Sequence, residues 1–343
     1  MRAGIISGRR QLEFKTFSRP SIAAPGTAVI DIALCGICGS DVSAYRDGEG
    51  YPPFLSGHEW VGTVVDVGSD VHGLHRGDRV IAATPPACGR CPMCLAGHAE
   101  RCAELTALSF GTHPLTPEHG AYAERITMPV EALVQVPDGV SDEQAVMVEP
   151  ATVALHAVRL QPIRLGDAAV VIGAGPVGLF AAQMLRLAGA RAVTVVEPRA
   201  RRRALALELG ANTAVAPDDA GDAVLAATSG IGADVVLDCV GTESALRSAV
   251  ELSRPGGTVV MVGVATGAVS ISPLSWLSKE ITLRASLAHL NHEFAMTMSF
   301  MESGQLRSEP MRERTIGLDG LEEALSSLAS GGDEIKVVVD PRL

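Results

Sequence analysis

The sequence predicts an α/β protein with a β-rich domain and a domain built on a doubly wound parallel sheet. Three observations lead to this expectation. The chain has 343 residues, which is enough for about two domains. Residues 1–152 contain short strand patterns separated by turn residues. In residues 153–289, patterns of buried strands alternate with helical patterns, as in a parallel sheet covered by helices.

Four segments of the first 152 residues have the pattern of strands. Their apolar residues alternate or run together, and turn residues such as Gly and Asp lie between them: 27–34, 60–68, 76–83 and 121–128. Many short strands with turn residues between them predict a compact barrel or sandwich.

The middle of the chain repeats the order of a strand followed by a helix. Residues 168–175 have a buried-strand pattern, and residues 176–189 have helical periodicity closed by a Gly. A second strand and helix are expected at 190–198 and 200–211, with later strands at 233–241, 256–264 and 281–288. Beyond residue 290 the pattern becomes helix, strand, helix, strand, at 292–304, 311–317, 321–331 and 335–340.

Composition and charge exclude several classes of protein. Hydrophobic residues make up 47% of the chain and aromatic ones only 3%, so the core depends on Ala, Val, Leu and Ile. The formal net charge of −11 gives a surface that repels nucleic acid and anionic membranes. No apolar stretch has the form of a signal peptide or reaches the ~20 residues of a membrane span. We therefore expect a soluble cytoplasmic protein that binds neither nucleic acid nor membranes.

Four cysteines lie in one short loop with the spacing C-x2-C-x2-C-x7-C: Cys88, Cys91, Cys94 and Cys102. Thiolates this close together can surround one tetrahedral Zn²⁺ and fill its coordination shell, which makes a structural site. A disulfide cluster is the alternative, but the chain has seven cysteines, an odd number, and no secretory leader. A bacterial iron–sulfur loop would continue with x3-C-P, whereas here Ala103 follows the fourth cysteine.

Residues 173–178 have the sequence G-A-G-P-V-G, which fits the dinucleotide-binding pattern G-x-G-x-x-G. The run lies between a predicted strand and a predicted helix, whose N-terminus supplies N–H donors for a pyrophosphate. Glu197 ends the next strand, where a carboxylate can bind the ribose hydroxyls of NAD. A Gly-rich turn without a ligand is the alternative. The residues expected to bind the cofactor are Gly173, Gly175, Pro176, Val177, Gly178, Glu197 and Arg202.

A second set of metal-ligand residues is spread over the first 150 residues: Cys38, His58, Glu59 and Glu149. A thiolate, an imidazole and a carboxylate can hold zinc and leave one coordination position open, as a catalytic site requires. Each residue also has an ordinary explanation. Cys35 and Cys38 could be buried thiols or a C-x-x-C redox pair, and a single His or Glu is usually structural.

Six runs of the sequence together carry a family resemblance: G-I-C-G-S-D at 36–41, G-H-E at 57–59, G-D-R-V at 77–80, the cysteine loop at 88–102, E-P at 149–150 and G-A-G-P-V-G at 173–178. The chain resembles the zinc-dependent medium-chain dehydrogenases/reductases, the alcohol dehydrogenase superfamily. The resemblance implies a GroES-like catalytic domain at 1–152 with both zinc sites, a Rossmann domain at 153–289, and a return to the catalytic domain at 290–343.

The resemblance also assigns roles to the candidate zinc ligands. Cys38 and His58 correspond to ligands of the catalytic zinc, and Cys35 corresponds to a bystander. Many alcohol dehydrogenases have a third ligand Cys where this chain has Glu149, and Glu there is similar to the polyol, butanediol and threonine dehydrogenase branch. Glu59 and Glu149 can each bind the zinc directly, or Glu149 through water, and the sequence leaves open which applies.

The activity implied by the resemblance is the interconversion of a secondary alcohol and its ketone with NAD. The alcohol is expected to be a polyol, cyclitol, amino alcohol or diol. Zinc would act on the alcohol as a Lewis acid, and hydride would pass to the nicotinamide. Ser40 corresponds to the hydroxyl that accepts the alcohol proton. Relatives often have a relay His three residues later, where this chain has Ser43, so another group or water would relay the proton.

Two alternative functions remain at this stage. An NADP-dependent aldehyde or ketone reductase is opposed by Glu197, while Arg199, Arg201 and Arg202 keep it open. A zinc-stabilised binding or sensor protein without turnover is the other alternative, although the candidate catalytic residues are all retained.

The resemblance further implies two zinc ions per chain, a small-molecule substrate and a homodimer or homotetramer. Relatives pair the edges of their Rossmann sheets between subunits, and the apolar strand at 281–288 would supply that edge. Fold alone does not identify the substrate. Candidates for the lining of its pocket are Tyr45, Phe110 and His289.

Overall fold

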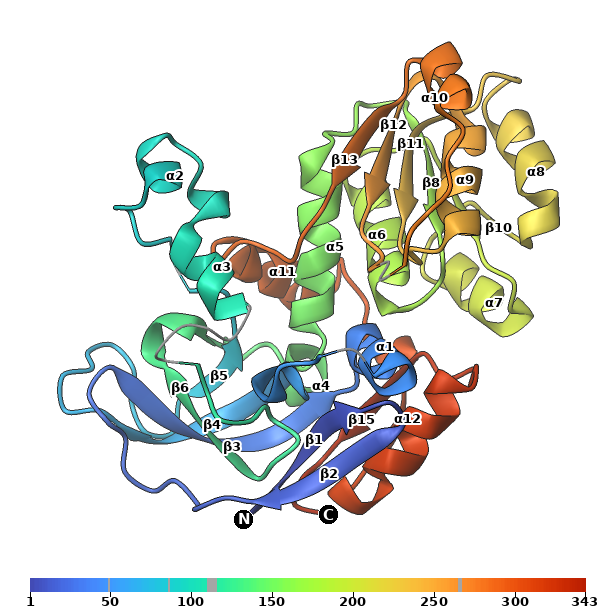
Figure 1. Cartoon of the computed structure of the whole chain (residues 1–343). Helices are drawn as coiled ribbons and strands as arrows, with labels where there is room; N and C mark the ends of the chain where they lie inside the picture. The colour runs from blue at the N-terminus through green and yellow to red at the C-terminus, as the bar shows by residue number, and fades with distance from the viewer. Residues whose placement is uncertain (49, 86, 110–115, 265–266) are drawn as a thin grey trace. The chain divides into compact units, whose positions relative to one another are not determined.

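The computed structural model describes every residue of the chain except 49, 86, 110–115 and 265–266, and it separates into two compact units (Figure 1). Unit 1 comprises Met1–Glu149, Leu290–Glu302 and Met311–Leu343, and unit 2 comprises Pro150–His289 and Ser303–Pro310. The first division thus lies at 149/150 rather than 152/153, and the short segment 303–310 lies with unit 2. One continuous helix crosses the first division, which is why no turn residue marks it in the sequence.

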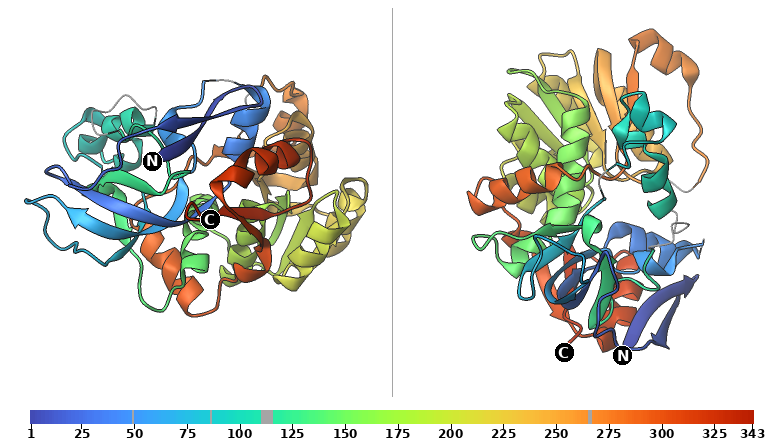
Figure 2. Two further views of the ribbon diagram at one scale, coloured as in Figure 1. Left: turned by 90° about the horizontal axis from the view of Figure 1, so that it is seen from below. Right: turned by 90° about the vertical axis from the view of Figure 1, so that its left-hand side faces the viewer.

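Unit 1 is β-rich, with a two-stranded hairpin and a mostly antiparallel sheet of seven strands. The hairpin consists of β1 (Arg2–Gly8) and β2 (Gln11–Thr16), which the sequence analysis did not predict. The sheet consists of β3 (Thr27–Gly36), β4 (Glu59–Val67), β5 (Arg79–Ala82), β6 (Arg125–Pro129), β7 (Leu133–Gln135), β14 (Arg312–Ile316) and β15 (Lys336–Val339). Its order is β14-β15-β3-β4-β5-β7, with β6 paired to β3. The two chain termini lie close together in this unit (Figure 2).

The described helices of unit 1 are α1 (Gly39–Asp47), α2 (Pro92–Leu95), α3 (Ala103–Ser109), α4 (Asp142–Ala145), α11 (Glu293–Glu302) and α12 (Leu321–Ala329). Residues Leu321, Ala324 and Leu325 of α12 recur at helical spacing and are buried in the main core of the unit. That core also contains Trp60 and Val337 from the sheet. The C-terminal segment therefore completes the core in which β3 and β4 are embedded.

Unit 2 is a six-stranded parallel sheet: β8 (Ala168–Ile172), β9 (Ala192–Val196), β10 (Thr213–Val215), β11 (Ala233–Asp238), β12 (Ser253–Met261) and β13 (Thr282–Ala285). Its order is β10-β9-β8-β11-β12-β13. Strands are added in one direction from β8 to β10 and in the opposite direction from β11 to β13, so the switch point lies between β8 and β11, as in doubly wound dinucleotide-binding sheets. The helices are α5 (Val148–Leu160), α6 (Pro176–Leu187), α7 (Ala200–Glu208), α8 (Ala220–Ala227), α9 (Glu243–Leu252) and α10 (Pro273–Lys279). They lie on both faces of the sheet (Figure 1).

Strand β13 forms one edge of the parallel sheet, and its four residues are all exposed. Leu283 within it and Leu287 just beyond it are among the exposed large hydrophobic residues. Within the part of the chain that the structure describes, no helix has the length and apolar character needed to cross a membrane.

Candidate metal and nucleotide sites

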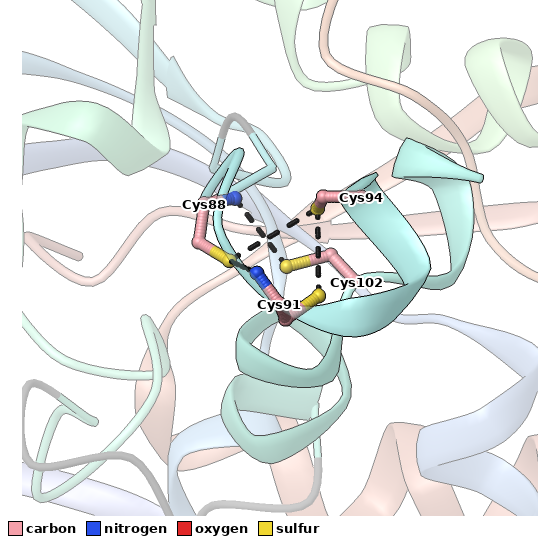
Figure 3. Close-up of side chains that lie close together, drawn as sticks. All are labelled: Cys88, Cys91, Cys94 and Cys102. Atoms are coloured by element: carbon pink, nitrogen blue, oxygen red, sulfur yellow. Dashed lines mark hydrogen bonds between the residues drawn. The ribbon is translucent and has the colours of Figure 1, made fainter. Parts of the chain in front are cut away.

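The four cysteines of the loop converge on one point (Figure 3). The Sγ atoms of Cys91 and Cys94 are 3.5 Å apart, and those of Cys88 and Cys94 are 4.0 Å apart. A zinc held by four thiolates at about 2.3 Å would space the sulfur atoms about 3.8 Å apart. The loop therefore fits a tetrahedral zinc. All seven cysteines lie in the described part of the chain and are free thiols, which argues against a disulfide cluster.

Backbone N–H groups point at the sulfur atoms of the loop. The amide of Cys91 donates to Cys88 Sγ at 3.4 Å, and the amide of Cys88 donates to Cys102 Sγ at 3.3 Å. Hydrogen bonds from the amides of Ala103 and Cys94 lower the pKa of Cys91 to about 6. Burial and the neighbouring Cys91 thiol raise the pKa of Cys94 to about 12. Zinc binding near neutral pH would therefore displace at least one proton.

The register of β3 and β4 brings the second group of ligand residues together. Gly36 at the end of β3 lies opposite Glu59 at the start of β4. Cys38 comes two residues after Gly36, and His58 comes directly before Glu59, so the two residues lie at the same end of the paired strands. The candidate ligand atoms of Cys38, His58 and Glu59 all lie within 4.8 Å of one another. These donors suit zinc and number fewer than four, so a zinc held by them keeps a position for another ligand.

Charges in this group favour the thiolate form of Cys38. Burial by itself would raise the pKa of Cys38, but the charge of His58 and a hydrogen bond with it lower that pKa below its usual value. Burial opposes the charged form of His58, but Cys38, Asp41 and Glu149 together raise its pKa well above the usual value. Glu149 therefore acts on His58 electrostatically, although it is not one of the three residues whose ligand atoms cluster.

His58 is oriented through one of its ring nitrogens. Its Nδ1 lies 2.9 Å from the carbonyl oxygen of Leu55 in the short 3-10 helix Pro53–Leu55. Because a carbonyl oxygen only accepts, this contact places a proton on Nδ1, so Nε2 is the nitrogen that can bind a metal once its own proton is displaced. Metal-binding histidines are commonly held in this way by their second nitrogen.

Lys336 of β15 lies beside this group, and the sequence analysis did not find it. Its ammonium forms a buried ion pair with the carboxylate of Glu59, and each residue is 1% exposed. The Lys336 Nζ also donates to the carbonyl oxygen of Ile37 at 3.0 Å. A Cβ atom at Gly36 would lie 2.6 Å from Lys336 Cε, so only glycine leaves room for the pair. The partners are 277 residues apart in the chain, which explains why no local pattern pointed to them.

Asp41, in the first turn of α1, is the second residue that the sequence analysis missed. It is fully buried, and its Oδ2 accepts hydrogen bonds from the amide of Cys38 at 3.0 Å and from Tyr122 Oη at 2.8 Å. Its Oδ1 accepts from Tyr51 Oη at 2.8 Å. Asp41 is the last residue of the run G-I-C-G-S-D, so this motif could have identified it as part of the site. The carboxylate fixes the backbone of Cys38 relative to the sheet.

In unit 2, the glycine-rich turn has the backbone geometry that a pyrophosphate requires. Gly173 has φ of +96°, a conformation that other residues rarely adopt. A Cβ atom at Gly178 would lie 1.9 Å from the carbonyl oxygen of Gly173, so the helix can approach the strand only with glycine there. Gly175 precedes α6, which begins with Pro176 and Val177. The first-turn N–H groups of such a helix are donors for an anion.

Glu197 lies immediately after β9 and is 4% exposed. Its two carboxylate oxygens accept hydrogen bonds from the amide of Ala174 at 2.9 Å and from the amide of Arg199 at 3.0 Å. Each oxygen has a further lone pair, which a ribose hydroxyl can use. Arg202 lies in the first turn of α7, and its side chain is half-buried. The turn and the carboxylate thus lie together at the ends of β8 and β9, as a dinucleotide site requires.

Two family models match the chain in consecutive segments. Residues 24–138 match the alcohol dehydrogenase GroES-like domain, and residues 176–303 match the zinc-binding dehydrogenase model. The chain belongs to the zinc-binding dehydrogenase family.

Relatives match this zinc-binding dehydrogenase over nearly its full length. A protein of Mycobacterium tuberculosis described as a probable zinc-binding alcohol dehydrogenase is 32% identical over 99% of this chain and 89% of its own. The (R,R)-butanediol dehydrogenase of Bacillus subtilis is 31% identical over 99% of this chain and 100% of its own. A structure from Sinorhizobium meliloti, described as a zinc-binding dehydrogenase bound to NADP, has a TM-score of 0.86 and 30% identity, and the match covers 99% of both chains.

These matches confirm the predicted α/β class with a GroES-like part and a Rossmann part. They support an oxidoreductase that acts on an alcohol or its carbonyl compound and uses zinc and a nicotinamide nucleotide.

The remaining candidates of this dehydrogenase lie in different places. Cys35 is buried within β3, outside the ligand group, and burial raises the pKa of its thiol. Tyr45 is 3% exposed and packs in the hydrophobic core of unit 1. His289 is in unit 2. Phe110 lies outside the described residues.

Proposed function

We propose that this chain is a zinc-dependent, NAD(H)-specific dehydrogenase of secondary alcohols that carry a neighbouring hydroxyl or amino group. The observation that carries the proposal is the cluster of Cys38, His58 and Glu59, which offers zinc fewer than four protein ligands. In contrast, the four cysteines of the loop fill a tetrahedral shell and supply structure alone. A purified chain that contains two zinc ions and turns over a secondary alcohol with NAD⁺ is the expected result.

In this proposal, Cys38 and His58 bind the catalytic zinc, and one carboxylate, that of Glu59 or Glu149, is its third protein ligand. The ion pair with Lys336 engages one oxygen of Glu59 and leaves the other for the metal. When bound, zinc supplies a Lewis acid that lowers the pKa of the substrate hydroxyl. Ser40 accepts the proton from that hydroxyl as it passes its own proton on to another group or to water. Asp41 holds the backbone of Cys38 and thereby fixes where the substrate oxygen is received.

The two carboxylates can be separated by substitution. Glu59→Gln leaves Lys336 buried without its charge partner, so it should destabilise the fold as well as weaken zinc binding. Glu149→Gln, at the start of α5, should weaken zinc binding or turnover with little loss of stability. Metal content and thermal unfolding of both variants measure the difference, and equal loss of stability in both would contradict these roles.

The preference for NAD(H) over NADP(H) follows from Glu197. Its buried carboxylate would accept the ribose hydroxyls and repel a 2′-phosphate by like charge. A tenfold preference needs only about 1.4 kcal/mol. We expect kcat/KM to be at least about tenfold higher with NAD⁺ and the preference to shrink in Glu197→Ala. Glu208→Ala is a matched control, because it removes a carboxylate that pairs with Arg307 at the surface.

A second candidate is an NADP-dependent reductase of the same family. The structural relative from Sinorhizobium meliloti is bound to NADP, and Arg199, Arg201 and Arg202 follow Glu197 closely in this chain. Equal kcat/KM for the two cofactors, or an advantage for NADP, would favour this candidate. No turnover with either cofactor in a zinc-loaded sample would favour a binding or sensor protein instead.

The substrate class follows from the polar character of the zinc group. A substrate with a neighbouring hydroxyl or amine can gain a hydrogen bond with Glu149, Glu59 or Ser43 that a plain alcohol cannot make, and such a bond to a charged group is worth roughly 1.5–3 kcal/mol. The similarity to a butanediol dehydrogenase agrees with this class. We expect polyols, cyclitols, amino alcohols or 2,3-diols to exceed ethanol by at least about tenfold in kcat/KM. If ethanol or benzyl alcohol is the best substrate, this class is wrong.

The active protein is proposed to be a homodimer or homotetramer in which a second copy covers β13. An edge strand with exposed Leu283 and a neighbouring exposed Leu287 would otherwise favour aggregation. Light scattering should give a multiple of the 35.6 kDa chain mass at micromolar concentration, and a monomer mass would contradict the proposal.

A further inference from the structure

We propose that the hydroxyl of Tyr51 is a positioning group that fixes the hydrogen-bond direction of Ser40 and so presents a lone pair of Ser40 to the substrate hydroxyl. The inference rests on the proposed alcohol dehydrogenase function and adds a residue to it. It addresses the position where relatives often have a relay His and this chain has Ser43.

Tyr51 lies between α1 and the 3-10 helix Pro53–Leu55, with its hydroxyl among polar groups of the zinc site. Its Oη is 2.8 Å from Asp41 Oδ1 and 3.4 Å from Ser40 Oγ. Two further contacts reach the carbonyl oxygen of Leu55 at 3.3 Å and His58 Nδ1 at 3.5 Å. The residue is half-buried, and four polar groups surround its hydroxyl.

The direction of the hydrogen bonds follows from the number of protons. A phenol has one proton to donate at neutral pH, and a carboxylate that receives several donors can only accept. The shortest contact of Tyr51 Oη is the one to Asp41, so its proton points there. The oxygen of Tyr51 can then only accept from Ser40. Since Ser40 donates its proton to Tyr51, its own lone pairs are left for the substrate.

The distance of 3.4 Å between Ser40 and Tyr51 is long for a bond between hydroxyls. Catalytic hydrogen bonds are often long before substrate binds and shorten in the complex. Without the Tyr51 hydroxyl, Ser40 could turn and donate its proton toward the substrate oxygen. In that orientation it cannot accept the substrate proton, so the effect should appear in kcat more than in KM.

The hydrogen bond itself can be tested without turnover. The chain has three tyrosines, so a zinc-loaded sample labelled with ¹³C at tyrosine Cζ gives three NMR signals, which Tyr→Phe variants assign. Ser40→Ala should shift the Tyr51 signal and leave that of Tyr122 in place. Tyr122 is the matched control, because its hydroxyl donates to the other oxygen of Asp41 at the same distance, 2.8 Å. An unmoved Tyr51 signal overturns the proposal.

The kinetic consequence is tested by a double-mutant cycle. Tyr51→Phe should lower kcat about tenfold, a part of the 10²–10⁴-fold that acid–base groups contribute, with KM within about twofold and unchanged zinc content. Adding Tyr51→Phe to Ser40→Ala should cause no further loss, because Tyr51 acts through Ser40. Tyr122→Phe should cause the same loss in both backgrounds. Losses from Tyr51→Phe that add to those of Ser40→Ala would show a merely structural role and overturn the proposal.

Failure of the proposed function gives a different result. If the zinc-loaded wild type oxidises no alcohol with either cofactor, the dehydrogenase proposal fails, and the catalytic role of Tyr51 fails with it. If turnover is found and the Tyr51 signal does not respond to Ser40→Ala, only the role of Tyr51 is wrong.

Discussion

The two metal-ligand groups of unit 1 differ in what holds them in place. The four cysteines of the loop come from one short segment, residues 88–102, whose helix α2 has no buried residue. Cys38, His58 and Glu59 instead lie at the ends of two paired central strands, beside the buried Asp41 and Lys336. The loop has little apolar burial of its own, whereas the second group adjoins residues of the hydrophobic core such as Ile37 and Trp60.

This difference separates the roles of the two proposed zinc ions. A segment with few buried contacts depends on its metal for folding, because binding free energy is then folding free energy. A group at the end of a packed sheet keeps its geometry when the metal is lost. Removing a ligand should therefore damage folding in the loop and chemistry at the second group.

The largest expected effect is that of Cys94→Ser in the loop. Structural zinc contributes on the order of 10–16 kcal/mol in small zinc domains, so this variant should lose one zinc and unfold the loop or aggregate. Cys239→Ser in unit 2 is the control, since Cys239 belongs to neither ligand group. Metal analysis and limited proteolysis of the loop measure the effect. If Cys94→Ser is as stable as Cys239→Ser, the loop does not depend on zinc.

At the second group, Cys38→Ser should abolish most activity and leave the fold intact. Loss of a catalytic metal removes several kcal/mol of transition-state stabilisation, so kcat/KM should fall by at least about 10³-fold while the melting temperature changes little. Cys35→Ser, which changes the buried thiol outside the ligand group, should retain its zinc. Equal zinc content in the two variants would contradict the assignment of Cys38 as a ligand.

Lys336→Met tests how the second group depends on the core. The substitution leaves the buried carboxylate of Glu59 without its partner, which should cost about 3–5 kcal/mol of unfolding free energy. The double variant Lys336→Met, Glu59→Gln removes that uncompensated charge and should regain part of the stability. Urea unfolding of the three proteins measures both steps. No recovery in the double variant would mean that packing of the lysine, and not its charge, matters.

The smallest effect concerns the pH dependence of zinc binding by the loop. The pKa of Cys94 is raised to about 12, so it carries a proton at neutral pH that zinc must displace, and affinity should rise by at least about tenfold per pH unit. Below about 6, the pKa of Cys91, one more proton must leave and the slope should steepen. Competition with a chelator between about pH 5 and 8 measures the zinc affinity of the loop. The Cys38→Ser variant is used so that the loop is the remaining zinc site. Affinity that does not change with pH would refute it.

Much of the fold could be predicted because its signals are local. The strand and helix patterns between residues 168 and 211 correspond to β8, α6, β9 and α7 within a few residues. The glycine-rich turn and the cysteine loop were also found directly, because all their functional residues lie within one short run. The β1–β2 hairpin and α1 were missed, since their apolar residues follow neither period over a sufficient length.

The amino-acid sequence by itself determined the spacing of the cysteine loop and the glycine-rich turn, because each lies within one short run of the chain. Cys38 and His58 are 20 positions apart, and the pairing of β3 with β4 brings them together. The tertiary structure decided which groups surround them. Lys336 reaches Glu59 across 277 residues, and Asp41 joins Tyr51 and Tyr122 from separate segments. Such contacts arise only when β15, β3 and β4 pack into one sheet, since burial then forces each charged or polar group to find a partner.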